Sequence, residues 1–272
     1  MHFMHLHLIS DSTGETVNSV ARAALAQFED VDVQEHSWSL VRTTRQVDRV
    51  LEEIKNHPGF VMYTLADSQL RRYFRESCHK LRVPCVSVLS RVIADLSSYL
   101  GQETKALPGK QYELDEEYFS RVEAINFTLT HDDGQSTWDL EEADIVIVGV
   151  SRTSKSPTSV YLAYRGYRTA NIPYVPGVAL PESLDNLQSP LIVGLTISEE
   201  RLIQIRKSRL LSINADDNTQ YVDPEKVKEE IIEAKRYFNK RKWPILDVTR
   251  RSVEESSAAI IELYQDKKKR KP

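Results

Sequence analysis

One stretch near the middle of the chain joins a hydrophobic strand, a polar loop and the start of a helix. Residues 144–149 read Asp-Ile-Val-Ile-Val-Gly, and such a run of β-branched residues is typical of a buried strand. A loop rich in hydroxyl side chains follows, and apolar residues then recur at helical spacing from Val160. This order is that of a phosphate-binding loop (P-loop), in which backbone N–H groups and a helix N-terminus face a polyphosphate. The sequence therefore predicts a phosphate site here.

The spacing of three residues supports the same interpretation. Gly149, Lys155 and Ser156 occupy the required positions of G-x-x-x-x-G-K-[ST], whereas Ser154 stands where the second glycine belongs. Glycine at that position lets the backbone turn with positive φ. An ordinary strand-to-helix turn with a solvated lysine would not explain the clustered hydroxyl groups. We expect phosphate binding by Gly149, Val150, Ser151, Arg152, Thr153, Ser154, Lys155 and Ser156, with Lys155 on the terminal phosphate and Ser156 helping to position magnesium.

Alternating strand and helix patterns fill the rest of the chain. Strands are expected at residues 3–9, 31–40, 60–65 and 85–89, and each is followed by apolar residues at helical spacing. This alternation predicts a mostly parallel, doubly wound (Rossmann-like) α/β lobe over residues 1–105. The period lapses near Pro108-Gly109, which we interpret as a linker. A P-loop kinase-like α/β lobe is then expected over residues 106–272.

Titratable groups outside the P-loop provide further candidates. His131, Asp132 and Asp133 precede the central strand and could form a base or a metal cluster, or merely an Asp-Gly turn. A helix with Arg201, Arg206, Lys207 and Arg209 could close over donor phosphates or could be a solvated face. Asp247, at the end of a hydrophobic run, gives a weak Walker B signal.

The N-terminal segment offers two weaker signals. Its first strand is followed by the hydroxyl-rich loop 10–16, which could hold an anion at a helix start. Simple N-capping by Ser12 or Thr13 is the alternative. His5 and His7 share one face of the strand, but without a third ligand nearby they are interpreted as strand histidines and not as metal ligands.

Charge and hydropathy restrict the partners and the location. A net charge of −4 argues against nucleic acid as the main partner, because binding to its phosphate backbone requires a broad basic surface. No apolar segment approaches the roughly 20 residues of a membrane span, and the first residues lack a signal-peptide layout. We therefore expect a cytoplasmic protein with no membrane contact.

Five segments together resemble the pyruvate, phosphate dikinase regulatory protein family, which also includes the phosphoenolpyruvate synthetase regulatory proteins. The resemblance extends from Ile9 to about Tyr264. Its motifs are ISDSTGET at 9–16, THDDG at 130–134, GVSRTSKSPT at 149–158, ANIP at 170–173 and GLTI at 194–197. The family motif tolerates serine at position 154.

The resemblance implies a bifunctional serine/threonine kinase and phosphorylase. ADP would be the donor for phosphorylation of a threonine of pyruvate, phosphate dikinase, and this modification would inactivate the dikinase. Inorganic phosphate would accept that phosphoryl group in the reverse direction, releasing pyrophosphate, with Mg²⁺ as the expected cofactor. The base would be Asp132, Asp133 or His131. A homodimer formed through the first lobe is also implied.

Three alternatives remain open at this point. The same chemistry could act on phosphoenolpyruvate synthetase, because both branches of the family share these motifs. The P-loop could belong to a small-molecule kinase. It could also belong to a nucleotide-sensing module that binds ADP without transferring a phosphoryl group.

Overall fold

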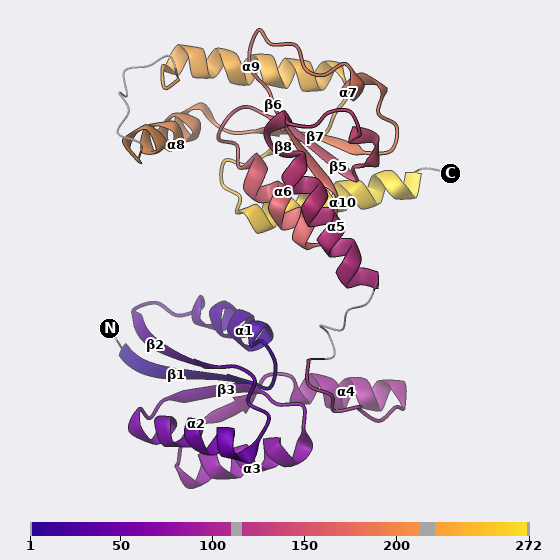
Figure 1. The fold of residues 1–272 in the computed structure, drawn as a ribbon. Coiled ribbons are helices and arrows are strands. Elements are labelled where there is room, and N and C mark those ends of the chain that lie inside the picture. Colours follow the sequence, from indigo (N-terminus) through magenta and orange to yellow (C-terminus); the bar gives the residue numbers. More distant parts are fainter. Residues whose placement is uncertain (1, 110–115, 213–220, 271–272) are drawn as a thin grey trace. The chain divides into compact units, whose positions relative to one another are not determined.

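The protein divides into two compact units, residues 1–113 and 114–272, in a computed structural model that describes residues 2–109, 116–212 and 221–270. Both units are mixed α/β structures built on a parallel sheet (Figure 1). The expected α/β fold class is thus confirmed. The expected linker near Pro108-Gly109 is followed by residues 110–115, which lie outside the described residues, as do residues 213–220.

The N-terminal unit is a four-stranded parallel sheet with helices on both faces (Figure 1). Alternate residues of the first strand explain this arrangement, because side chains on a strand point to opposite faces. Leu6 and Leu8 pack against the first helix, whereas Ile9 packs against the second and third. The strands are β1 (His2–Ser10), β2 (Val31–Trp38), β3 (Phe60–Thr64) and β4 (Cys85–Ser87), in the order β2-β1-β3-β4, and the helices are α1 (Glu15–Leu25), α2 (Thr44–Asn56), α3 (Ser68–Lys80) and α4 (Ser90–Leu100).

The C-terminal unit repeats this strand order in a second parallel sheet, β6-β5-β7-β8. Helices α5, α6 and α10 cover one face of it, and α8 and α9 cover the other (Figure 1). The strands are β5 (Ile145–Gly149), β6 (Thr169–Pro173), β7 (Leu191–Thr196) and β8 (Ile245–Asp247), and the helices are α5 (Glu116–Thr130), α6 (Lys155–Tyr164), α7 (Ser183–Asn186), α8 (Glu199–Ser212), α9 (Pro224–Lys240) and α10 (Val253–Arg270).

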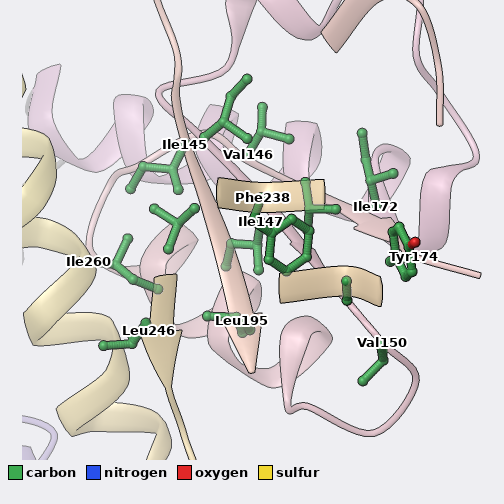
Figure 2. Close-up of a cluster of buried hydrophobic side chains, with 14 of the residues drawn as sticks. Ile145, Val146, Ile147, Val150, Ile172, Tyr174, Leu195, Phe238, Leu246 and Ile260 are labelled. Carbon is green, nitrogen blue, oxygen red and sulfur yellow. The ribbon is translucent and has the colours of Figure 1, made fainter. Parts of the chain in front are cut away.

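Strand β5 lies at the centre of this sheet and of the hydrophobic core. It pairs with β6 on one side and with β7 on the other, and all five of its residues are buried. Figure 2 shows Ile145 and Ile147 among the side chains that α9 and α10 contribute, including Phe238 and Ile260. The carboxyl end of β5 is therefore held rigidly at the middle of the sheet.

Close packing on β7 requires a glycine. A Cβ atom at Gly194 would lie 2.3 Å from the ring of Phe238 in α9. The missing side chain lets α9 approach the sheet directly. Within the described residues, no helix combines the length and the apolar character needed to cross a membrane.

Candidate functional site

The predicted P-loop leaves the sheet at Gly149, the last residue of β5. A Cβ atom there would lie 2.9 Å from the hydroxyl oxygen of Thr153 and 3.1 Å from the carbonyl oxygen of Leu195. The Thr153 hydroxyl donates a hydrogen bond of 2.9 Å to the carbonyl oxygen of Val150, which closes the loop on itself. Close packing therefore requires glycine at this position. A left-handed backbone is not the reason, because the φ of Gly149 is not positive.

Ser154 adopts the conformation for which a P-loop ordinarily uses glycine. Its φ is 59° and its ψ is 26°, and Arg152 also has a positive φ of 72°. Left-handed residues other than glycine are uncommon and carry a steric cost. Serine therefore supplies at position 154 the left-handed conformation that the second glycine of the motif would allow. No side chain caps the N-terminus of α6, which leaves its first N–H groups able to bind an anion.

Lys155 is buried at the start of α6, with only 7% of its surface exposed. Its Nζ donates a hydrogen bond of 3.0 Å to the carbonyl oxygen of Val150. Burial lowers the pKa of Lys155 to about 8, while the nearby carboxylates of Asp133 and Asp132 act in the opposite direction. A buried ammonium group without a paired anion is costly, so the side chain is poised to gain a negatively charged ligand.

Next to Lys155, three polar side chains from different elements meet. The Ser156 hydroxyl donates to Oδ1 of Asp132 at 2.9 Å. Asn171 of β6 donates from Nδ2 to the same Oδ1 at 2.5 Å and to the Ser156 hydroxyl at 3.0 Å. A carboxylate and a hydroxyl held this close are hard oxygen ligands of the kind that Mg²⁺ prefers.

The segment 131–133 does not bring its three titratable side chains together. Asp133, with φ 53°, and Asp132 line the site, whereas the His131 ring is buried elsewhere. Its Nε2 lies 2.6 Å from Oδ1 of Asp139, and its Nδ1 lies 2.7 Å from the carbonyl oxygen of Phe127. Both ring nitrogens are thus engaged in structural contacts.

The metal-cluster interpretation of residues 131–133 is wrong. Within the described ranges, no group of three or more His, Cys, Asp or Glu side chains could hold a metal ion. His5 and His7 likewise belong to no such group. Magnesium would therefore have to be held by few protein ligands together with substrate phosphates, as is common for this ion.

A cavity of about 610 Å³ opens at this end of the sheet, a size typical of small-molecule sites. Besides the charged and hydroxyl-bearing groups, its wall includes the apolar side chains of Pro173, Val175 and Ile205. It is lined by Asp132, Asp133, Ser151, Arg152, Ser154, Lys155, Ser156, Pro157, Pro173, Val175 and Ile205. It lies outside the carboxyl end of the central strand, where open α/β sheets ordinarily bind their ligands.

Arg206 is buried and holds the backbone of the loop at Ser151. It is 2% exposed and forms an ion pair of 2.8 Å with Glu230. Its Nη2 donates to the carbonyl oxygen of Ser151 at 3.2 Å, and its guanidinium stacks 4.4 Å above the ring of Tyr221. Arg206 is therefore neither a solvated residue nor a lining residue of the cavity.

The other candidates in the C-terminal unit lie away from the cavity. Arg201, Lys207 and Arg209 are exposed, as the solvated-face alternative predicted. The Asp247 carboxylate accepts hydrogen bonds from the backbone N–H of Thr249 at 2.8 Å and from its hydroxyl at 2.5 Å. It stands at the end of the edge strand β8, with β7 between it and β5, so the geometry does not support a Walker B role.

A smaller cavity, of about 190 Å³, lies at the carboxyl ends of the strands in the N-terminal unit. The loop that follows β1 and the side chain of Arg71 form part of its wall. The N-cap residue of α1 is Gly14, with φ 88°, and neither Ser12 nor Thr13. The Thr13 hydroxyl still accepts the backbone N–H of Glu15, the first residue of α1, at 3.5 Å. Anion binding by this loop stays a prediction.

Asn171 is a supporting residue to which the sequence pattern assigned no role, and Arg206 supports the loop instead of taking either of the two roles expected for its helix. Asn171 does leave a signal, because it interrupts a buried strand next to the P-loop strand. A buried polar residue needs partners, and these partners are Asp132 and Ser156. Arg206 leaves no such signal, because one of four basic residues on a helix cannot be distinguished from the others by spacing.

The sequence matches the family model described as kinase/pyrophosphorylase over residues 6–261. A protein of Paramagnetospirillum magneticum is 53% identical over 261 residues, covering 96% of this chain and 84% of that protein. One of Maricaulis maris is 52% identical over 264 residues, covering 97% and 94%, and one of Wolbachia pipientis is 50% identical over 264 residues, covering 96% of each. The names of all three describe pyruvate, phosphate dikinase regulatory proteins.

Proposed function

The chain belongs to the kinase/pyrophosphorylase family of dikinase regulatory proteins, and from this premise we propose that it phosphorylates and dephosphorylates one threonine of pyruvate, phosphate dikinase. ADP is the donor in the first reaction, which yields AMP. Inorganic phosphate is the acceptor in the second, which yields pyrophosphate. The observation that carries the proposal is the buried Lys155 at the N-terminus of α6, beside a cavity with two carboxylates.

The loop after β5 supports phosphate binding through its backbone. The turn formed by Arg152 and Ser154 leaves the first N–H groups of α6 uncapped, and Lys155 adds a positive charge at the first position of this helix. Phosphoryl transfer requires mainly alignment and electrostatic stabilisation from a protein. ADP can serve as donor if its β-phosphate occupies the place where the γ-phosphate of ATP would lie in a related kinase.

Asp133 is the residue that best fits the role of base. Asp132 already accepts hydrogen bonds from Ser156 and Asn171, and both ring nitrogens of His131 are engaged. Asp133 lines the same cavity as Lys155. We therefore assign the proton of the threonine hydroxyl to Asp133, with His131 as an anchor of the segment.

The two directions then use one set of groups. In the forward reaction the threonine oxygen forms a bond to the β-phosphorus of ADP, the bond from that phosphorus to the bridging oxygen breaks, and the proton passes to Asp133. In the reverse reaction an oxygen of inorganic phosphate attacks the phosphothreonine phosphorus. Asp133 takes the proton of the attacking phosphate and passes it to the threonine oxygen as that oxygen leaves. Magnesium, held by Ser156 and the phosphates, supplies charge neutralisation when bound.

The alternatives differ in what they turn over. Relatives that share about half of the sequence carry the name of the dikinase, which favours it over the synthetase as the target. A small-molecule kinase would consume ADP without any protein substrate. A sensing module would bind ADP and release no AMP. A cytoplasmic location, expected from the sequence, stays part of the proposal.

The test is incubation of the purified protein with ADP and the dikinase phosphorylated on its catalytic histidine. We expect phosphothreonine on the dikinase and an equal amount of AMP. Addition of inorganic phosphate should then remove the phosphothreonine and release pyrophosphate. AMP formed without the dikinase would favour a small-molecule kinase, and stable ADP binding without AMP would favour a sensor. Modification of the synthetase alone would reassign the target.

The N-terminal unit supports the proposed homodimer. Helix α4 contains no buried residue and exposes Val92, Leu96 and Tyr99. An uncovered apolar helix face of this kind is typical of protein contacts. We expect a dimer in sedimentation equilibrium, and a shift to monomer in the Leu96→Glu variant. A wild-type protein that is monomeric at micromolar concentration would refute this part of the proposal.

A further inference from the structure

The hydrogen bonds around Ser156 and Asp132 leave two oxygen positions unused. A hydroxyl group has one donor and two lone pairs. The Ser156 hydroxyl donates to Asp132 and accepts from Asn171, so one lone pair remains. Both hydrogen bonds to the Asp132 carboxylate are received by Oδ1. Among the described residues, Oδ2 of Asp132 has no hydrogen-bond donor.

Asn171 holds the Asp132 carboxylate and the Ser156 hydroxyl next to each other. It lies on β6, directly opposite Ile147 of the central strand, and is 1% exposed. Its side chain contacts Asp132 and Ser156 together, and its backbone N–H donates to the carbonyl oxygen of His131 at 3.0 Å. The residue thus holds the backbone before Asp132 as well as its carboxylate.

The arrangement carries a cost that packing alone would not justify. Oδ1 of Asn171 is buried and has no partner among the described residues. An unsatisfied buried acceptor of this kind costs about 1–3 kcal/mol. An apolar residue would avoid that cost on a strand that is otherwise buried. The two hydrogen bonds from Nδ2 are therefore the property that distinguishes asparagine from leucine here.

We propose that Asp132 and Ser156 are the two protein ligands of the magnesium ion that accompanies the nucleotide, and that Asn171 is the residue that positions them. This inference rests on the proposed function and divides the two adjacent carboxylates between two roles. Asp132 binds the metal, and Asp133 exchanges the proton. Mg²⁺ demands nearly ideal octahedral geometry and takes one or two protein ligands beside substrate phosphates. A rigid pair with a single negative charge fits that demand.

The neutral amide of Asn171 suits this task. It donates to both ligands and adds no charge, so it does not compete with the cation or alter the charge of the pair. Outer residues that orient metal ligands typically affect metal affinity 10-fold to 100-fold. An effect of that size should appear in binding measurements that involve no phosphoryl transfer.

The experiment measures ADP affinity by calorimetry in Mg²⁺ and in EDTA, for the wild type and for Asn171→Leu. Mn²⁺ binding to the protein–ADP complex, followed by electron paramagnetic resonance, is a second measurement. We expect wild-type ADP affinity to fall in EDTA. The Asn171→Leu variant should lose at least about 10-fold in Mn²⁺ affinity and should keep its ADP affinity in EDTA within about 2-fold.

Two further variants secure the result. Thr169→Val changes a buried polar residue of the same strand that contacts neither Asp132 nor Ser156, and it should leave the metal dependence unchanged. Asp132→Asn keeps the shape of the side chain but removes its charge, and it should reduce Mn²⁺ affinity even if Asn171→Leu does not fold.

Each result decides one of the two proposals. Unchanged Mn²⁺ affinity in folded Asn171→Leu, or in Asp132→Asn, overturns the inference while ADP binding itself stands. Wild-type ADP binding that is independent of metal also overturns it. A wild-type protein that binds no ADP in either solution overturns the proposed function first.

Discussion

At the scale of single residues, the environment of Lys155 controls both stability and chemistry. Its pKa is lowered to about 8 by burial, so part of the population is neutral at slightly alkaline pH. A bound phosphate would favour the charged form again. We therefore expect ADP binding above pH 8 to be accompanied by proton uptake, which calorimetry in buffers of different ionisation enthalpy can detect.

Replacement of Lys155 by methionine should abolish both reactions and stabilise the C-terminal unit. Methionine retains the length of the side chain but removes the buried charge. The pKa of Lys155 in the folded protein lies below its unfolded value of 10.5. Below about pH 8 the buried charge therefore lowers the free energy of unfolding by its full amount, and this loss disappears as the pH rises towards 10.5. We expect the free energy of unfolding, measured in urea, to rise by about 1–3 kcal/mol at pH 7.5 and by less at pH 9.5.

The exposed Lys207→Met is the matched control and should change neither property. Normal rates of phosphorylation and reversal in Lys155→Met would show that no phosphate binds beside this lysine. A loss of stability at pH 7.5 would contradict the argument from burial.

Substitution of residues 131–133 should separate a chemical role from a structural one. Asp133→Asn is expected to reduce both rates by about 10²–10⁴, the usual contribution of a general base. His131→Gln should lower the free energy of unfolding by about 1–3 kcal/mol, because it disturbs the buried contacts to Asp139 and Phe127. Its folded fraction should bind ADP within about 2-fold of the wild type. If Asp132→Asn and Asp133→Asn both retain normal rates, the segment is only a turn.

At the scale of elements, the strand, loop and helix around residues 145–164 follow from the local sequence. The apolar run of β5 and the helical spacing of α6 are visible in neighbouring residues. Helix α5 continues to Thr130 through Thr128, although threonine has a low helix propensity, because the Thr128 hydroxyl accepts the backbone N–H of Thr169 in β6. Such extensions depend on tertiary contacts and not on propensity.

The left-handed turn at Ser154 predicts a stabilising substitution. Ser154→Gly should raise the free energy of unfolding by up to about 1 kcal/mol, because glycine adopts positive φ without a steric cost. Ser120→Gly on the exposed surface of α5 is the control, and it should destabilise by about 0.5–1 kcal/mol. Equal losses for both variants in chemical denaturation would mean that Ser154 is not strained.

At the scale of the whole molecule, the two units share one strand order but differ in their buried polar groups. The N-terminal unit contains a cluster of histidines in which His7 stacks on His36 at 4.6 Å and donates to the carbonyl oxygen of His57. His5 lies 3.0 Å from His36, and Glu53 pairs with His57. Burial is the main cause that lowers the pKa of His7 and of His36.

The N-terminal unit should therefore lose stability in mild acid. Because the folded pKa of His7 lies below its unfolded value of 6.5, the neutral form contributes stability above pH 6.5 that is lost as the pH falls further. Hydrogen exchange, corrected for intrinsic rates, should show β1 losing protection between pH 7.5 and 5.5 by a larger factor than β5. The effect should shrink in His7→Gln, which removes the titrating ring. Equal losses in both strands would contradict this prediction.

The sequence by itself determined the alternating strands and helices of the N-terminal unit, the strand, loop and helix around residues 145–164 and, through its motifs, the family. The elements follow from the spacing of apolar residues that are close together in the chain, and the family follows from the residue identities in its motifs. Only the tertiary structure decided which of His131, Asp132 and Asp133 reaches the site, because their directions depend on Asp139, Ser156 and Asn171. It also decided that Arg206 supports the loop, through a partner in another helix. The direction of a side chain is set by partners distant in sequence, and no local pattern records them.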